Sequence, residues 1–148
     1  MRLPDFIIAG ARKCGTTWLH ERLSLHPQFF FPQTTKEIFF FDRYWDRGLS
    51  WYADYFRNSP TDAICGEASP TYFTDEVAAK RIHETLPHAK MLFIFRNPIS
   101  RARSHYEHLV AKADTRASFE RAIEEFPEIV NEGLYFKHLS RFVDLFVA

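Results

Sequence analysis

Short apolar runs alternate along the chain with segments in which apolar residues recur at helical spacing. The runs predict strands at 6–9, 29–31, 63–65 and 91–95. The helical spacing predicts helices from 16 to about 26, from 75 to about 86, from 98 to about 110, over 118–126 and after 134. Strands that alternate with helices indicate an α/β fold in which helices flank a parallel β-sheet with right-handed crossovers. We expect residues 1–148 to form a single domain.

Two of the predicted strands stand out by their apolar character. Met91–Phe95 is apolar at every position, which predicts a central strand that is covered on both faces. Residues 6–9 are the best candidate for its neighbour in the sheet. Because the carboxyl ends of parallel strands bind ligands in open α/β sheets, the loops that follow these two strands are expected to share one binding edge.

The loop after the first strand is bracketed by Gly10 and Gly15 and runs into a helix. A strand, a glycine loop and a helix N-terminus together favour anion binding, because backbone N–H groups and the helix dipole converge there. The glycine spacing matches the phosphate-binding pattern G-x-x-x-x-G-K-[ST], but Thr16 occupies the lysine position and Lys13 lies inside the loop. An ordinary strand-to-helix turn is the alternative. A P-loop kinase or another nucleotide phosphotransferase would require a lysine directly after Gly15.

A second cationic segment follows the strand at 91–95. Arg96 stands at the carboxyl end of that strand, where it either contacts an anion or forms a structural ion pair. Pro98 suits the first turn of the next helix. On that helix Arg101, Ser104 and His108 are expected to share one face.

Glu37 and the aromatic segment after it each allow two interpretations. Taken alone, Glu37 favours a solvent-exposed residue at a helix start, and a carboxylate held at a cleft wall is the alternative. Trp51, Tyr55 and Tyr52 fall near one helical face, which favours core packing over a platform for a sugar or another ring.

Composition narrows the possible partners. The chain is 46% apolar and carries 19 basic and 19 acidic residues, so no net charge points to nucleic acid or a membrane surface. Cys14 and Cys65 give neither a disulfide framework nor a zinc spacing. Asp42 and Glu67 are the only carboxylates considered for a metal, and ordinary structural roles are favoured for both. No apolar run approaches the roughly 20 residues that span a bilayer, and the polar N-terminus does not resemble a signal peptide, so a cytoplasmic protein is expected.

Two motifs, taken together, resemble the sulfotransferases that use 3′-phosphoadenosine 5′-phosphosulfate (PAPS). Residues 12–19, Arg-Lys-Cys-Gly-Thr-Thr-Trp-Leu, resemble the 5′-phosphosulfate loop of that family. Residues 95–106, in which Ser104 follows Arg96 by eight positions, resemble its 3′-phosphate motif. Segments 36–42, 66–73 and 133–142 are similar to the carbohydrate (heparan-sulfate type) and bacterial branches. The resemblance covers nearly the whole chain in the same order.

The resemblance implies a P-loop-like donor site. Lys13 would contact the bridging oxygen of PAPS and stabilise the departing 3′-phosphoadenosine 5′-phosphate (PAP). The other residues that the resemblance assigns to donor binding are Arg12, Cys14, Gly15, Thr16 and Thr17 around the 5′-phosphate, Trp18 against the adenine, and Arg96 and Ser104 on the 3′-phosphate.

The resemblance also implies the reaction. Sulfuryl transfer passes in line between two oxygens through a loose transition state, as phosphoryl transfer does, so the protein mainly orients the reactants and stabilises charge. Glu37 matches the general base of the carbohydrate branch, which reverses the preference for a solvent-exposed glutamate. The acceptor would be a hydroxyl or an amine, with a carbohydrate as one candidate, and no metal is expected. The oligomeric state is not indicated.

Two departures from the family pattern qualify these expectations. Ala68 stands where the glucosaminyl 3-O branch has a lysine. The family's domain also continues past this length with a further strand and a basic, glycine-containing loop that closes over the nucleotide. Residues 1–148 are therefore expected to lack this part, to bind the nucleotide weakly and to turn over poorly. A phosphotransferase and a non-catalytic bisphosphate-binding domain are the alternative functions.

Overall fold

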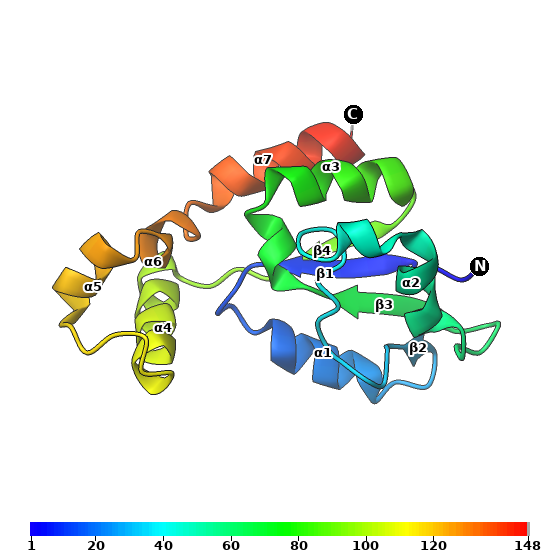
Figure 1. Cartoon of the computed structure of the whole chain (residues 1–148), viewed down its shortest axis with the longest axis horizontal. Helices are drawn as coiled ribbons and strands as arrows, with labels where there is room; N and C mark the ends of the chain where they lie inside the picture. The colour runs from blue at the N-terminus through cyan, green and yellow to red at the C-terminus, as the bar shows by residue number, and fades with distance from the viewer. Residues whose placement is uncertain (148) are drawn as a thin grey trace.

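A parallel four-stranded sheet lies at the centre of the chain, with helices on both of its faces (Figure 1). The computed structural model describes residues 1–147. The strand order is β2–β3–β1–β4, and each neighbouring pair is parallel. The strands are β1 Phe6–Gly10, β2 Phe29–Phe30, β3 Ile64–Ala68 and β4 Lys90–Phe93. The predicted α/β fold, a parallel sheet flanked by helices, is confirmed.

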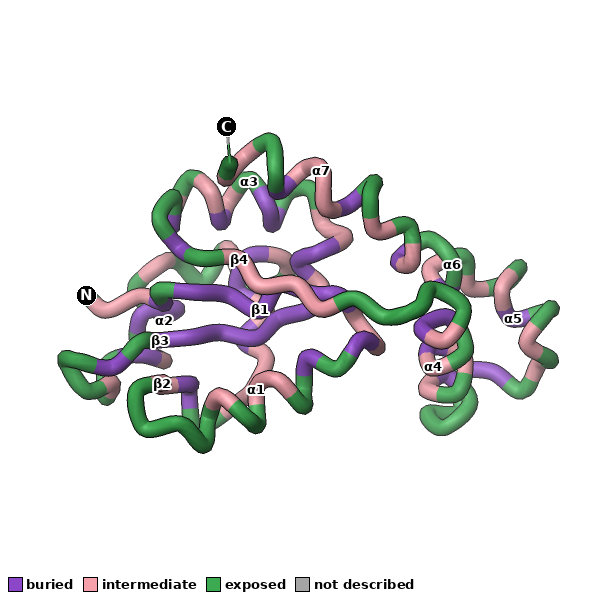
Figure 2. The backbone as a smooth tube through the Cα atoms, turned by 180° about the vertical axis from the view of Figure 1, so that it is seen from behind, coloured by how far each residue is buried: buried purple, intermediate pink, exposed green. Residues whose placement is uncertain are grey.

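Strand β1 is the centre of the sheet, and all five of its residues are buried. It pairs with β3 on one side, with Ile8 opposite Ala68, and with β4 on the other, with Ile8 opposite Leu92. Figure 2 shows β1 and β3 as the most continuously buried part of the backbone. The apolar run at 6–9 therefore reports burial on both faces, as parallel strands require.

The prediction for Met91–Phe95 is wrong in part. Strand β4 does neighbour β1, but among residues 1–147 it lies at the edge of the sheet, and none of its four residues is fully buried. Met91 and Phe93 pack against the last helix, where the ring centroids of Phe93 and Phe142 are 4.9 Å apart, whereas Leu92 packs against the cluster that contains Ile8. An entirely apolar strand can therefore be an edge strand covered by a helix as well as a central strand with two neighbours.

The strand predicted at 63–65 also differs, because β3 continues through Gly66 and Glu67 to Ala68. Gly66 fits there because Phe6 and Phe31 fill the space where a side chain would stand. The segment then continues as a short 3₁₀ helix, η3 (Pro70–Phe73), instead of the predicted loop.

The helices begin close to the predicted positions. Asp75 caps the third helix by accepting a hydrogen bond from the amide of Ala78 at 2.8 Å, and Asn97 caps the fourth in the same way. Among residues 1–147 no helix combines the length and apolar character that crossing a membrane requires. The bounds are α1 Thr16–Ser24, α2 Leu49–Ala53, α3 Glu76–Thr85, α4 Pro98–Ala111, α5 Phe119–Glu125, α6 Glu128–Asn131 and α7 Tyr135–Phe146, with 3₁₀ helices η1 Trp45–Arg47 and η2 Asp54–Phe56.

These helices occupy three positions around the sheet. Figure 1 shows α3 and α7 on one face of the sheet, α1 on the other, and α4–α6 beyond the carboxyl ends of the strands. The aromatic segment packs on the first of these faces: Tyr52 is fully buried and its ring stacks on Phe40 at 4.4 Å between centroids. Trp51 and Tyr55 are partly buried against the same cluster. The prediction that these aromatic residues pack in the core is therefore confirmed.

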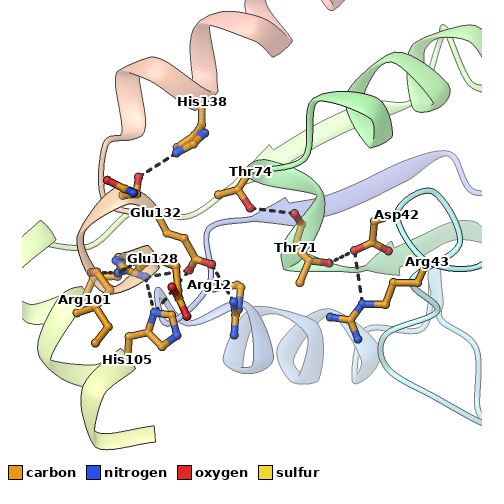
Figure 3. Close-up of polar contacts among 12 residues, drawn as sticks. Arg12, Asp42, Arg43, Thr71, Thr74, Arg101, His105, Glu128, Glu132 and His138 are labelled. Atoms are coloured by element: carbon orange, nitrogen blue, oxygen red, sulfur yellow. Dashed lines mark hydrogen bonds and ion pairs between the residues drawn. The ribbon is translucent and has the colours of Figure 1, made fainter. Parts of the chain in front are cut away.

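A buried ion pair and backbone hydrogen bonds join α4 to α6 and to Glu132, which follows it (Figure 3). The side chain of Arg101 is fully buried, and its guanidinium donates to Glu132 Oε2 at 3.1 Å and to the carbonyls of Glu128 and Ile129. His105 Nδ1 lies 3.7 Å from the same Glu132 oxygen. Arg101, expected on one face of α4 with Ser104 and His108, is buried and turns toward α6, whereas Ser104 and His108 are half-buried.

We predict that Gly66→Ala lowers the free energy of unfolding by about 1–3 kcal/mol, because the new methyl group overlaps the rings of Phe6 and Phe31. Urea denaturation followed by circular dichroism measures the change. Ile64→Val, at an exposed position of the same strand, is the matched control and should change stability by less than about 0.5 kcal/mol. Equal stability of Gly66→Ala and the wild type would contradict the packing described for β3.

His105 predicts a pH dependence of stability. Burial, followed by the charges of Arg12 and Arg101, lowers the pKa of His105 from 6.5 to about 4. Between these two values the unfolded chain binds the proton more readily than the folded chain, so the free energy of unfolding decreases as pH falls through that window, by roughly 1–3 kcal/mol. His105→Gln should flatten the profile, whereas His88→Gln, at an exposed histidine, should keep it. Denaturation midpoints measured from pH 7 to pH 4 provide the test.

Candidate functional site

A cleft opens at the carboxyl edge of the sheet, where the loops after β1, β3 and β4 meet the N-terminus of α1 and one face of α4. Six of its lining residues are lysine or arginine, and Glu37 is the only carboxylate among them. The cleft therefore suits a ligand with several negative charges. The lining residues are Arg12, Lys13, Gly15, Thr16, Thr17, Lys36, Glu37, Phe39, Arg43, Pro70, Thr71, Arg96, Ser104, His108 and Lys112.

The loop after β1 presents backbone amides and one cation to the cleft. Lys13 (φ 63°) and Gly15 (φ 102°) adopt the left-handed conformation, which glycine accepts without steric cost. Helix α1 begins at Thr16 with no side-chain cap and no acidic residue in its first turn, so its first amides are not occupied by a capping side chain. Burial, followed by the charges of Arg12, Lys112 and Arg101, lowers the pKa of Lys13. These are properties of a site built for an anion.

Arg12 lines the cleft, but its charge is already paired. Its Nη1 donates to Glu132 Oε1 at 2.8 Å, while the other oxygen of Glu132 accepts from Arg101 (Figure 3). One buried carboxylate thus ties the loop after β1 to helix α4. The contact fixes the position of this loop relative to the helix that carries Ser104.

Glu37 is held at the wall of the cleft. Its Oε1 accepts a hydrogen bond from Lys36 Nζ at 2.9 Å, and the same ammonium group reaches Thr17 Oγ1 at 2.8 Å. No helix starts at this position, since the next helical residue is Trp45. Of the two alternatives for Glu37, a carboxylate at a cleft wall is therefore the one that the structure shows.

Arg96 and Ser104 meet in the cleft from two consecutive elements. Arg96 follows β4, and within residues 1–147 its side chain forms no ion pair within 4.0 Å, so the structural ion pair considered above is not formed. Its carbonyl oxygen accepts from Tyr135 at 2.9 Å, which fixes the backbone. Ser104 lies on the face of α4 that continues with His108 and Lys112.

Two residues of the predicted donor site do not line the cleft. Cys14 is buried, and its Sγ lies 3.3 Å from the hydroxyl of Tyr135, so its side chain packs inside the protein. Trp18 lies on α1 with 60% of its surface exposed. A contact between Trp18 and an adenine ring stays a prediction.

Sequence reasoning missed Arg43 and the residues around it. The guanidinium of Arg43 lies 4.0 Å from the centroid of the Phe39 ring, and its Nε lies 3.9 Å from the carboxylate of Asp42. Thr71 donates to that carboxylate at 2.6 Å, and burial raises the pKa of Asp42 (Figure 3). His108 and Lys112 were also missed as cleft residues. His108 follows Ser104 by four positions and Lys112 follows His108 by four, and this helical spacing is the signal that could have found Lys112.

Comparison with known proteins identifies the family. The family model described as "Sulfotransferase domain" matches residues 3–147. The human bifunctional heparan sulfate N-deacetylase/N-sulfotransferase 2 is 43% identical over 121 residues, covering 76% of this chain and 14% of that protein. The mouse heparan sulfate glucosamine 3-O-sulfotransferase 6 is 34% identical over 153 residues, covering 98% of this chain and 44% of that protein.

A solved structure gives the same result. The crystal structure of a sulfotransferase from Alicyclobacillus acidocaldarius is 30% identical, with a TM-score of 0.86, and the match covers 99% of this chain and 70% of that one. The chain spans less than half the length of the two curated relatives. Because the family model matches almost every residue and the fold agrees with that of a solved member, the chain belongs to the sulfotransferase domain family.

Proposed function

We propose that the protein transfers a sulfuryl group from PAPS to a hydroxyl or amine of a carbohydrate acceptor. The observation that carries this proposal is the cleft itself, which gathers Lys13, Glu37, Arg96 and Ser104 from four separate segments. A donor with phosphate at both ends fits such a site, because the α1 N-terminus and the Arg96–Ser104 pair offer two places for an anion. Membership of the sulfotransferase family supports the same donor.

Lys13 stabilises the leaving group in this proposal. As the bond between sulfur and the bridging oxygen breaks, negative charge collects on that oxygen, and a lysine ammonium on a flexible stem can follow it. The amides of Gly15, Thr16 and Thr17 hold the 5′-phosphate, and Thr17 also contacts Lys36. Arg96 and Ser104 hold the 3′-phosphate.

Glu37 removes the proton from the attacking hydroxyl or amine. Its position at the cleft wall and the absence of a second carboxylate in the lining support this role. Lys36, bonded to the same carboxylate, keeps Glu37 aligned until the acceptor arrives. The acceptor oxygen or nitrogen then attacks sulfur from the side opposite the leaving oxygen.

Arg43 supplies a cation on the acceptor side of the cleft. Ala68, where the 3-O branch has a lysine, is fully buried in β3 and presents no charge. Arg43 lines the cleft close to Phe39 and is exposed enough to meet a carboxylate or sulfate of the acceptor. The relatives named for heparan sulfate support an anionic carbohydrate as that acceptor.

We predict that Lys13→Ala lowers kcat by about 10²–10³-fold and that Glu37→Gln lowers it by about 10²–10⁴-fold. Radiolabelled PAPS and de-N-sulfated, de-O-sulfated heparan oligosaccharides, with and without EDTA, measure the transfer. Lys80→Ala, at an exposed lysine on α3, is the control and should keep the wild-type rate. Glu37→Gln should still bind PAP. Binding of PAP by the wild type without transfer would favour a non-catalytic domain, and transfer of phosphate from ATP would favour a phosphotransferase.

The lowered pKa of Lys13 predicts an alkaline limit to the reaction. Its neighbours and its burial favour the neutral amine, so Lys13 loses its proton, and its catalytic charge, at a lower pH than an ordinary lysine does. The rate should therefore fall as pH rises through that pKa. Because arginine stays charged at all these pH values, Lys13→Arg should move the alkaline limb upward even where its maximal rate is lower. An unchanged alkaline limb in Lys13→Arg would assign the limit to another group.

A further inference from the structure

A buried carboxylate, Glu67, lies behind the wall of the cleft and accepts three hydrogen bonds. Its side chain, on β3, is fully buried. Its Oε2 accepts from the hydroxyl of Tyr52 on α2, and its Oε1 accepts from Ser69 Oγ at 2.7 Å and from Tyr72 Oη at 2.6 Å. Three hydroxyl donors converge on one carboxylate, so the ionised form, which only accepts, satisfies all of them.

Two of the three hydroxyls continue the chain of hydrogen bonds to the backbone of the cleft wall. Ser69 Oγ accepts from the amide of Phe39 at 3.2 Å, and Tyr72 Oη accepts from the amide of Phe41 at 3.3 Å. Each hydroxyl has a single proton, which it gives to Glu67, so its lone pairs are left for the amide. The hydroxyl of Tyr52 makes no such link to this segment.

The backbone held in this way is strained and lies next to Glu37. Phe39 has φ 55°, a left-handed conformation that costs a non-glycine residue about 1–2 kcal/mol. The turn at Phe39 lets Phe40 and Phe41 enter the core while Glu37, two residues earlier, stays in the cleft. Arg81 adds one more tie by donating to the carbonyl of Phe41 at 2.8 Å.

We propose that Glu67 is a positioning residue for Glu37. Glu67 orients the hydroxyls of Ser69 and Tyr72, and these hydroxyls hold the amides of Phe39 and Phe41 in the segment that carries Glu37. The inference rests on the proposed role of Glu37 as the base. A proton on Oε2 would make the hydroxyl of Tyr52 accept and would leave both links to the cleft wall, whereas a proton on Oε1 would make Ser69 or Tyr72 accept and would remove one link. Burial raises the pKa of Glu67, the nearby charge of Asp42 adds to this, and the hydroxyls of Tyr52, Tyr72 and Ser69 oppose it.

Ser69→Ala and Tyr72→Phe each remove one link to the cleft wall, whereas Tyr52→Phe removes a hydroxyl from the same carboxylate without touching the wall. Three measurements separate these variants: amide hydrogen exchange at Phe39 and Phe41, kcat and KM with PAPS and the desulfated heparan oligosaccharides, and the Kd of PAP. Ser69→Ala should raise exchange at Phe39, and Tyr72→Phe at Phe41, by about 10-fold or more. Both should lower kcat by about 10–100-fold while the Kd of PAP stays unchanged.

The controls distinguish positioning from stability. Tyr52→Phe should lower the unfolding temperature about as much as Tyr72→Phe does, yet change kcat by less than about 3-fold. Glu67→Gln is the conservative variant, because its amide oxygen can still accept from Ser69 and Tyr72 while its amide nitrogen donates to Tyr52. It should retain more of kcat than Ser69→Ala.

Equal kcat losses in Tyr52→Phe and Tyr72→Phe, or faster exchange at Phe39 with unchanged kcat, would overturn the inference. So would unchanged exchange in Ser69→Ala. The failure of the proposed function gives a different result. In that case the wild-type chain forms no sulfated product, while exchange at Phe39 and Phe41 still reports whether the Glu67 network holds the segment.

Discussion

The pairing of β1 with a parallel strand on each side is the constraint on which the rest of the structure depends. Every residue of β1 is buried and carries no polar side-chain group, so its backbone groups must bond to the neighbouring strands and to Ser69 and Ile94, which follow them directly. That register brings the carboxyl ends of β1, β3 and β4 to one edge. Lys13, Thr71 and Arg96 follow these three ends, and the cleft forms where they meet.

The cleft brings together cations that repel one another, and two carboxylates neutralise part of this charge. Glu132 forms ion pairs with Arg12 and Arg101, and Glu37 forms one with Lys36. Burial, and then the charges of Arg12, Lys112 and Arg101, lower the pKa of Lys13, so part of this shift reflects repulsion among the cations. A multiply charged anion bound in the cleft would relieve that repulsion.

The sequence predicts those parts of the site whose residues all come from one continuous strand–loop–helix unit. The loop with Lys13 and Gly15, and the Arg96–Ser104 pair, are such units, and both line the cleft. The edge position of β4 was not predictable from its composition, because packing against Phe142 demands the same apolar residues as a central strand. Arg43, Glu67 and Glu132 were missed or assigned no role because their contacts join residues that only the folded chain brings together.

Glu132 makes the spacing between the two anion-binding ends of the cleft a fixed property of the fold. By holding Arg12 and Arg101 at once, it connects the loop before α1 to the helix that carries Ser104 with a single short rigid bridge. Under the proposed function, a ligand whose two charged ends match that spacing gains its second contact as an intramolecular step, at high effective concentration. A nucleotide with all its phosphates at one end gains only the first. If the proposed function is correct, the Glu132 bridge would favour ligands whose two charged ends match the spacing it fixes.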